Sequence, residues 1–205
     1  MENLALSPVI LLSGYIRPAA QAGRCHASCT ITLLPGPEPI LVDTGVPGQG
    51  GELIRALAAR GLAPADIRYV VLTHGHSDHV GNNGLFPEAT LLLDTDVSRG
   101  DEYWVHDFAA GPFLPVPGVE VIRTPGHSDH DLTVLVRTAD GVVAVAGDLF
   151  EYENDWGDGA WREWSRNLAL QQANRELICA RARWIIPGHG GRFAAPGLAE
   201  LRGGG

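Results

Sequence analysis

The chain has 205 residues, of which 45% are hydrophobic and 19% are charged, and its formal net charge at pH 7 is −9. This length and composition fit one soluble globular domain and exclude a fibrous or intrinsically disordered protein. The acidic balance predicts weak nonspecific affinity for polyanions, so no DNA partner is expected. All 15 basic residues are arginines, which excludes a lysine Schiff-base mechanism.

Targeting signals are absent from the sequence. The N-terminus has no basic stretch followed by a long apolar run, and no apolar run reaches the roughly 18 residues that a membrane helix needs. We therefore expect no membrane association and a cytoplasmic location. Cys25, Cys29 and Cys179 lack the spacing of a disulfide framework or a zinc finger, and we interpret them as reduced thiols.

Short apolar runs bounded by glycine, proline and polar residues predict a series of β-strands. In chain order these runs cover residues 7–17, 30–34, 40–42, 67–72, 90–93, 119–122, 132–136, 142–146 and 184–186. Apolar spacing predicts one helix around 53–58 and another over 161–182. Clustered strands with few helices between them predict an α/β fold in which two sheets pack face to face with helices outside. We expect a single domain over residues 1–197 and a frayed tail at 198–205.

The longest stretch without a clear pattern covers residues 94–118 and contains the aromatic residues Tyr103, Trp104 and Phe108. Irregular segments of more than about 12 residues are usually functional or disordered. Two interpretations stay open for this stretch: a lid that lines a substrate pocket, or aromatic side chains packed onto a sheet.

Candidate chemistry concentrates in the loop at residues 73–81. Its sequence, Thr-His-Gly-His-Ser-Asp-His-Val-Gly, follows the apolar run 67–72 directly, so one strand would end in His74, His76, Asp78 and His79. Neutral imidazole nitrogens and carboxylate oxygens are the donors that zinc and its neighbours take. Because of their alternation, His74 and His76 can face one ion while Asp78 and His79 reach a second. The loop therefore predicts a metal site.

Three further segments repeat the pattern of an apolar strand followed by a turn of small residues with one ligand-type side chain. The turns at 124–127, 147–148 and 187–190 carry His127, Asp148 and His189. Their glycines and prolines allow the backbone to turn sharply at the end of a strand. We expect these side chains to converge on the loop at 73–81.

Together, these motifs resemble the five-histidine, two-aspartate metal set of the metallo-β-lactamase superfamily. The resemblance extends from about residue 9 to residue 193 and includes Leu-Val-Asp-Thr-Gly at 41–45. It implies an αββα sandwich of two mixed β-sheets, with a binuclear site at the edge where the sheets meet. It also implies that Asp43 orients a ligand histidine from behind. Capping of the turn before the next helix is the alternative role for Asp43.

The resemblance assigns a place to each candidate ligand. The first ion would be held by His74, His76 and His127. The second ion would be held by Asp78, His79 and His189. Asp148 would bridge the two ions. We expect two divalent ions per chain, with zinc preferred and iron or manganese as alternatives.

The reaction class follows from such a site. Two ions about 3.5–4 Å apart clamp a water and lower its pKa to about 7. The resulting metal-bridging hydroxide would attack a carbonyl or phosphoryl centre of an ester-type bond. Asp78 would orient this hydroxide as the catalytic carboxylate. No serine or cysteine nucleophile is needed, so the sequence predicts a direct hydrolase.

Within the superfamily, the motifs resemble those of the group around metallo-β-lactamase domain-containing protein 1. That group is linked to endoribonuclease action on histone pre-mRNA, which implies a phosphodiesterase or endoribonuclease. Arginines near the predicted last helix could guide an RNA backbone, although solvated surface arginines are the commoner explanation. These arginines are Arg162, Arg166, Arg175, Arg181 and Arg183.

The alternative is a small-molecule lactone, carboxyl ester or thioester hydrolase. A neutral substrate would suit the acidic surface and an aromatic pocket built from Tyr103, Trp104, Phe108 and Trp156. A third interpretation is a metal-binding module without hydrolytic activity, like the flavodiiron relatives, but 205 residues leave no room for a flavin partner domain. The choice between RNA and a small ester stays open, as does a homodimer.

Overall fold

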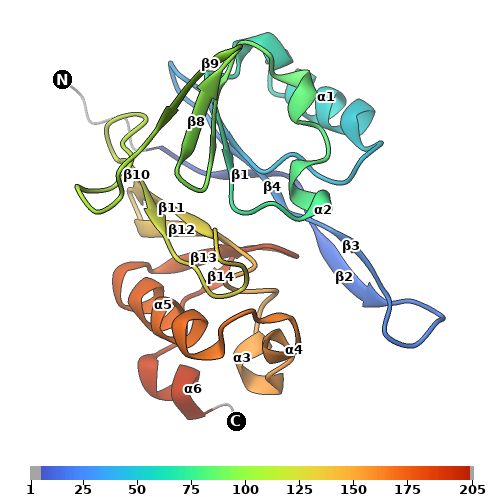
Figure 1. The fold of residues 1–205 in the computed structure, drawn as a ribbon, viewed down its shortest axis with the longest axis vertical. Coiled ribbons are helices and arrows are strands. Elements are labelled where there is room, and N and C mark those ends of the chain that lie inside the picture. Colours follow the sequence, from blue (N-terminus) through green and yellow to red (C-terminus); the bar gives the residue numbers. More distant parts are fainter. Residues whose placement is uncertain (1–5, 204–205) are drawn as a thin grey trace.

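The apolar runs fold into two β-sheets that face each other, with helices on both outer sides (Figure 1). The computed structural model describes residues 6–203. Within this range no helix is both long enough and apolar enough to cross a membrane. The two layers of sheet and two layers of helix agree with the predicted αββα sandwich.

The first sheet has seven strands in the order β1-β4-β5-β6-β7-β8-β9. In chain order these are β1 (Val9–Leu12), β4 (Ile31–Leu34), β5 (Ile40–Val42), β6 (Tyr69–Leu72), β7 (Thr90–Leu93), β8 (Asp96–Arg99) and β9 (Glu102–Val105). The central strands β5, β6 and β7 pair in parallel and are covered on both faces, which requires continuous apolar runs. Their parallel direction brings the residues that follow β5 and β6 to one edge of the sheet.

The second sheet has five strands in the order β10-β11-β12-β13-β14. They are β10 (Val119–Arg123), β11 (Leu132–Thr138), β12 (Gly141–Gly147), β13 (Trp184–Pro187) and β14 (Phe193–Ala194). β12 and β13 pair in parallel, and β10 points the same way because β11 runs antiparallel to both β10 and β12. The turns that follow β10, β12 and β13 therefore lie at one edge.

Strands β2 (Tyr15–Pro18) and β3 (Cys25–Ser28) form a separate hairpin, which stands away from the two sheets beyond α2 (Ser77–Val80) in Figure 1. The expected single strand over 7–17 is wrong, because the chain leaves the first sheet after β1 and turns at Gly14. A Cβ at Gly14 would lie 2.5 Å from the carbonyl oxygen of Ser28. This close crossing of two backbones separates β1 from β2.

Helices cover the outer faces of both sheets. α1 (Gly50–Ala58) packs through Leu53 and Leu57 on the first sheet, and α5 (Leu168–Arg181) packs through Ile178 on the second. The remaining helical segments are α3 (Asp155–Asp158), α4 (Trp161–Trp164), α6 (Leu198–Gly203) and the 3₁₀ turns Pro64–Asp66 and Asn83–Leu85. The expected continuous helix over 161–182 is interrupted, because Asn167 caps the start of α5 by accepting a hydrogen bond from the Leu170 amide.

Buried apolar side chains form three layers. Between the sheets, Val42 and Val71 of the first sheet belong to one cluster with Val121, Val134 and Val145 of the second. A second cluster lies between the first sheet and α1, and a third lies between the second sheet and α5. Both sheets are therefore held rigidly, which fixes the edge where their strand ends meet.

Of the two interpretations left open for the stretch 94–118, the structure favours the structural one for most of its length, because β8 and β9 form a hairpin that extends the edge of the first sheet. Residues 198–203 are not frayed, because they form α6 with Leu201 buried and Arg202 bonded to Glu176. Residues 204–205 of the expected tail lie outside the described residues.

Candidate metal centre

The loop after β6 is held in place by Asp43, which follows β5. The Asp43 carboxylate accepts hydrogen bonds from the Thr73 amide at 2.7 Å and from the Thr73 hydroxyl at 2.8 Å. Its Oδ2 also lies 2.8 Å from Nδ1 of His79. Asp43 has a φ of 61°, a left-handed conformation that aspartate tolerates better than most residues. Asp43 thus positions a histidine from behind, in the arrangement that the resemblance implies.

Close backbone approaches bring the strand ends of the second sheet to the same place. A Cβ at Gly188 would lie 1.7 Å from Oδ1 of Asp148, so only glycine leaves room for that carboxylate. A Cβ at Gly126 would lie 2.4 Å from Cα of Gln171 on α5. These two glycines let the turns that carry His127 and His189 pass close to their neighbours.

Asp148 lies at the centre of the cluster, and its two oxygens face different histidines. Its Oδ2 lies 3.5 Å from Nε2 of His74 and 3.3 Å from Nε2 of His127. Its Oδ1 lies 3.2 Å from Nε2 of His79 and 3.5 Å from Nε2 of His189. One carboxylate therefore divides four imidazole rings into two pairs.

The seven residues predicted from the sequence form two groups around this carboxylate. The first half-site is the set His74, His76, His127 and Asp148. The second half-site is the set Asp78, His79 and His189, which shares Asp148. Within the second half-site, Asp78 Oδ2 lies 3.9 Å from Nε2 of His79 and 3.8 Å from Nε2 of His189. In each of these groups, leaving Asp148 aside in the second, the potential ligand atoms lie within 4.8 Å of one another.

The donor atoms fit divalent metal ions. Among the described residues, Nε2 of His74, Nε2 of His79 and Oδ1 of Asp148 are buried and have no hydrogen-bond partner. Buried polar atoms without a partner are costly and rare in folded proteins. Imidazole nitrogens and carboxylate oxygens that converge in this way are the donor set that zinc takes. The cluster could therefore hold metal ions.

Burial and neighbouring charges shift the pKa values of several groups in this cluster. Burial, together with His79 beside it, lowers the pKa of His74 well below its usual value and keeps this imidazole neutral. Burial opposes ionisation of Asp148, but His79, His74 and His189 outweigh it and hold the pKa of this carboxyl well below its usual range. Burial also disfavours a charged His189, yet Asp148 raises its pKa to about 9. A divalent ion would displace that proton, because metals bind the deprotonated ligand.

Glu151 is part of the site, although the pattern of strand-end ligands assigns it no role. Its side chain is almost fully buried, and Oε1 lies 3.2 Å from Nδ1 of His127. Its Oε2 lies 3.9 Å from Nε2 of His189. Burial and the charge of Asp148 raise the pKa of this carboxyl. The sequence offers one signal for this residue: Glu151 is acidic and comes three positions after Asp148, in the segment that follows β12.

A buried ion pair supports the segment that carries Asp148 and Glu151. Asp155 accepts a hydrogen bond from the Glu151 amide at 2.8 Å and pairs with the guanidinium of Arg175. Arg175 also donates to the carbonyl of Leu149 at 2.9 Å. Because both charged groups are fully buried, loss of either partner would leave an uncompensated charge beneath the site.

The four aromatic residues expected to form a substrate pocket do not meet. Tyr103 and Trp104 are exposed on β9, with 61% and 40% of their surface accessible. Phe108 packs against the cluster between the sheets, whereas Trp156 belongs to the cluster on the outer face of the second sheet. The expectation was wrong because the hairpin β8–β9 places its aromatic side chains at a sheet edge.

The arginines that could guide an RNA backbone all have partners within the chain. Arg175 is fully buried in the ion pair with Asp155. Arg166 pairs with Asp129 and Arg181 with Glu120. Arg162 lies against the ring of Trp161, and Arg183 donates to the carbonyl of Asp140.

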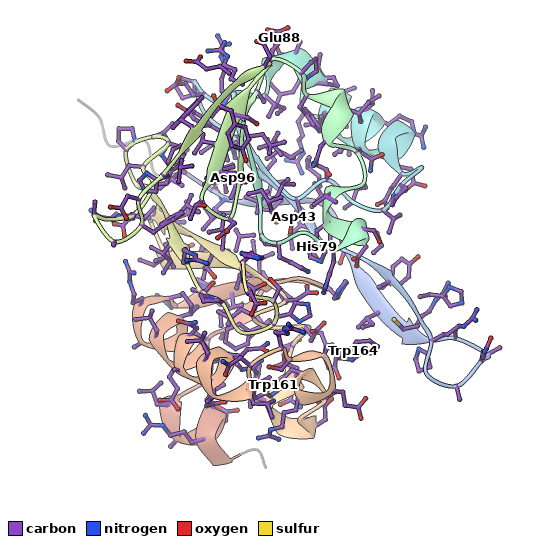
Figure 2. The ribbon with its side chains drawn as sticks, in the orientation of Figure 1. Asp43, His79, Glu88, Asp96, Trp161 and Trp164 are labelled. Carbon is purple, nitrogen blue, oxygen red and sulfur yellow. The ribbon has the colours of Figure 1, made fainter. Side chains whose placement is uncertain are left out.

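A cavity of about 420 Å³ opens beside the cluster, between the β2–β3 hairpin and the segment around α4. Glu151 lines this cavity and also contacts His127, so the cavity is connected to the metal centre through Glu151. Trp164 lines the same wall as Glu151, opposite the hairpin, and Figure 2 shows this side chain on the side of α4 that faces the hairpin.

Comparison with known proteins agrees with this geometry. The sequence profile of the metallo-beta-lactamase superfamily matches residues 26–92. Metallo-beta-lactamase domain-containing protein 1 from Xenopus laevis is 44% identical over 188 residues, covering 90% of this chain and 79% of the relative. The protein of the same name from Homo sapiens is 40% identical over 218 residues, covering 91% and 81%.

Solved structures share the fold. An N-acyl homoserine lactone hydrolase, with the product N-hexanoyl-L-homoserine at its catalytic metal centre, superposes with a TM-score of 0.65 and 20% identity over 90% of this chain and 92% of its own. A metallo-beta-lactamase family protein from Thermus thermophilus gives a TM-score of 0.62 and 22% identity over 95% and 77%. The chain belongs to the metallo-beta-lactamase superfamily of metal-dependent hydrolases, in the group of metallo-beta-lactamase domain-containing protein 1.

Proposed function

We propose that the protein is a binuclear metal hydrolase that cleaves an ester-type bond. The observation that carries this proposal is the position of Asp148, because each of its oxygens faces one pair of imidazole rings. A carboxylate shared in this way suits two cations side by side better than one. Two bound divalent ions would activate a water near neutral pH and polarise the bond that is attacked.

The residues of the chain divide this work. The first ion would be held by His74, His76 and His127, and the second by Asp78, His79 and His189, with Asp148 shared. Asp43 fixes the ring of His79, and the carbonyl of Ser28, 2.9 Å from Nδ1, fixes the ring of His189. Glu151 does the same for His127. Such outer contacts set the tautomer and orientation of a ligand histidine.

Asp78 is the carboxylate that we propose for orienting the attacking water. Its side chain is 18% exposed, whereas that of Asp148 is 5% exposed, so Asp78 is the one that entering solvent reaches. A carboxylate oxygen can accept a hydrogen bond from that water and align it with the substrate. Zinc is the proposed ion because histidines dominate the donor set, with iron or manganese as alternatives.

The first candidate substrate is a phosphodiester, including single-stranded RNA. Its support in this chain is the cavity wall beside the metal centre, which carries Arg17 and Arg24. The second candidate is a neutral lactone or carboxyl ester. The net charge of −9 and the apolar surface of Trp164 favour it, and N-acyl homoserine lactonase from Bacillus cereus is 24% identical over 82% of this chain. The three free cysteines are consistent with a cytoplasmic location for either activity.

The test uses purified, metal-quantified protein with four substrates: single-stranded RNA, bis-p-nitrophenyl phosphate, a lactone and a neutral ester. We expect about two divalent ions per chain and hydrolysis that stops when a chelator removes them. RNA cleavage should fall steeply between about 50 and 200 mM salt, whereas turnover of a neutral ester should stay nearly constant. Salt-insensitive ester turnover without any phosphodiester cleavage would reject the first candidate. No hydrolysis by fully loaded protein would reject both.

A further inference from the structure

The cavity beside the metal centre has two unlike walls. One wall is the β2–β3 hairpin, and the other is the segment from Glu151 to α4. The residues on the two walls are Ile16, Arg17, Pro18, Gly23, Arg24 and Cys25 from the hairpin, and Glu151, Tyr152, Ala160, Glu163 and Trp164 from the opposite segment. A volume of about 420 Å³ accommodates a small molecule or one unit of a polymer.

The hairpin wall carries two arginines without a carboxylate partner. Arg17 ends β2 and stacks on Tyr15, with its guanidinium carbon 5.2 Å from the ring centre. Arg24 precedes β3, where its backbone closes the hairpin turn with Ala19 and Gln21. Neither side chain forms an ion pair with any residue that the structure describes, although six other arginines in this acidic chain do.

The root of the hairpin is hydrogen-bonded to the turn that carries His189, which places the hairpin beside the metal centre. The carbonyl of Ser28, at the end of β3, lies 2.9 Å from Nδ1 of His189. Thr30 donates from its amide to the carbonyl of Gly188 at 2.6 Å and from its hydroxyl to that of Gly190 at 2.8 Å. These contacts join the root of the hairpin to the turn that carries His189.

The opposite wall offers a flat apolar surface. Trp164 is 46% exposed although it lines the cavity, and Tyr152 lies beside it. An exposed indole on a cavity wall provides a stacking face for a planar group. Glu163 and Glu151 are two acidic residues on the same side, so the cavity is cationic at the hairpin and combines apolar surface with two acids on the opposite wall.

We propose that Arg17 and Arg24 bind an oxyanion of the substrate, a phosphate or a carboxylate, while a planar group next to that oxyanion stacks on Trp164. Guanidinium groups bind both anions through paired hydrogen bonds, which gives orientation as well as affinity. This inference rests on the proposed function, because the cavity matters for catalysis only if the cluster is the reaction centre. The substrate would therefore be an anion that carries a planar group next to its phosphate or carboxylate.

The experiment measures binding of matched ligand pairs to the metal-loaded protein by calorimetry. 5′-AMP is compared with adenosine for the phosphate, and benzoate with benzyl alcohol for the carboxylate, so the two sources of an oxyanion are tested separately. The variant R17Q/R24Q removes both charges but keeps the stems of the side chains. The control R55Q/R60Q removes two exposed arginines on and just after α1, neither of which lines this cavity.

In the unmodified protein we expect at least one oxyanion to bind about tenfold or more tightly than its neutral partner. R17Q/R24Q should lose this preference, and R55Q/R60Q should keep it. Trp164→Ala should weaken 5′-AMP but leave ribose 5-phosphate, which lacks the flat base, unchanged. If the preference persists in R17Q/R24Q, or if neither oxyanion is preferred, the proposal is wrong.

Two further measurements separate this proposal from the proposed function. Metal content and the midpoint of thermal unfolding show that R17Q/R24Q is folded and loaded. Hydrolysis of RNA, bis-p-nitrophenyl phosphate, a lactone and a neutral ester, each tested separately, shows whether the centre is catalytic. An active enzyme with no role for the arginines overturns this inference alone. An inactive, metal-loaded protein whose oxyanion preference depends on Arg17 and Arg24 overturns the hydrolase proposal and leaves the anion site standing.

Discussion

The second half-site is fixed from behind by the chain, whereas the first half-site is partly open to solvent. His79 and His189 are both buried, and each Nδ1 lies within 2.9 Å of a fixed oxygen, from Asp43 and Ser28 respectively. In the first half-site, His127 has Glu151 at 3.2 Å, but His76 is exposed. Nδ1 of His76 lies 3.1 Å from Nε2 of His127, and no backbone or carboxylate oxygen among residues 6–203 is bonded to it.

One shared carboxylate, that of Asp148, thus joins a rigid half, the second half-site with its ligands held in place, to an adaptable half, the first half-site with one exposed ligand. Preorganised ligands lose little freedom when they bind an ion, whereas an exposed ligand must first be ordered. We therefore expect the second half-site to bind its ion more tightly. The first half-site, with a ligand that can move, is the better place for a substrate to displace solvent.

The largest effect is expected for a change at Asp148, because both half-sites depend on this residue. Asp148→Ala should reduce the metal content of both half-sites and abolish turnover of every substrate, because one carboxylate faces all four buried rings. Elemental analysis and hydrolysis assays check this, with Asp140→Ala, at an exposed turn, as the matched control. Retention of two ions per chain in Asp148→Ala would reject the bridging role.

The next largest effect is expected for a variant that alters only the second half-site. Asp43→Asn keeps a side chain that tolerates the positive φ but removes the charge behind His79. Loss of such an outer partner costs about 10–100-fold in metal affinity or activity. The second ion should weaken by this factor while the first ion stays, as measured by competition with a chromogenic chelator. Equal weakening of both ions would contradict the division into two halves.

Stepwise chelation compares the halves in the unmodified protein. A mild chelator should first remove the ion held by His76, because that ligand is exposed, and leave about one ion per chain. His76→Ala should then have no effect on the remaining ion, whereas His189→Ala should remove it. If His76→Ala depletes the last ion instead, the order of affinities is the reverse of the one we expect.

A smaller effect is expected for Glu151, the outer partner of His127 in the first half-site. Glu151→Gln keeps the shape of the side chain next to His127 but removes its charge. We expect the first ion to weaken by about tenfold, at the low end for such contacts, because His74 and His76 still hold it. The second ion should be unaffected in the same titration.

The smallest effects are expected for substitutions of residues that lie outside both half-sites. Trp104 lies on the exposed edge strand β9, so Trp104→Ala should leave metal content and KM unchanged. Trp164→Ala should raise KM because this residue lines the cavity beside the centre. A change of KM in Trp104→Ala but not in Trp164→Ala would restore the lid interpretation.

The metal cluster could be predicted from the sequence because each candidate ligand directly follows an apolar strand. The signals are local: His74 comes two residues after β6, and Asp148 comes one residue after β12. Parallel strands bring such ends to one edge without any further information. The central strands of both sheets were predictable for the same reason, since buried parallel strands have continuous apolar runs.

The cavity could not be predicted, because its walls come from segments without such patterns. The β2–β3 hairpin has exposed residues on most of its length and packs on neither sheet, so no apolar alternation marks it. Edge strand β9 is exposed at all four positions, so it too has no buried face that an apolar pattern could reveal in the sequence. The place of Glu151 depends on Asp155 and Arg175, whose pairing joins residues 20 positions apart.

The bonds between Thr30 and Gly190 span 160 residues, and they close the molecule around the second half-site. A growing chain on the ribosome cannot form this closure until Gly190 has been synthesised. The rigid half of the centre is therefore the last part to become competent. A chain stalled before β13 would lack His189, so its second half-site would be incomplete although His127 and Asp148 were already present.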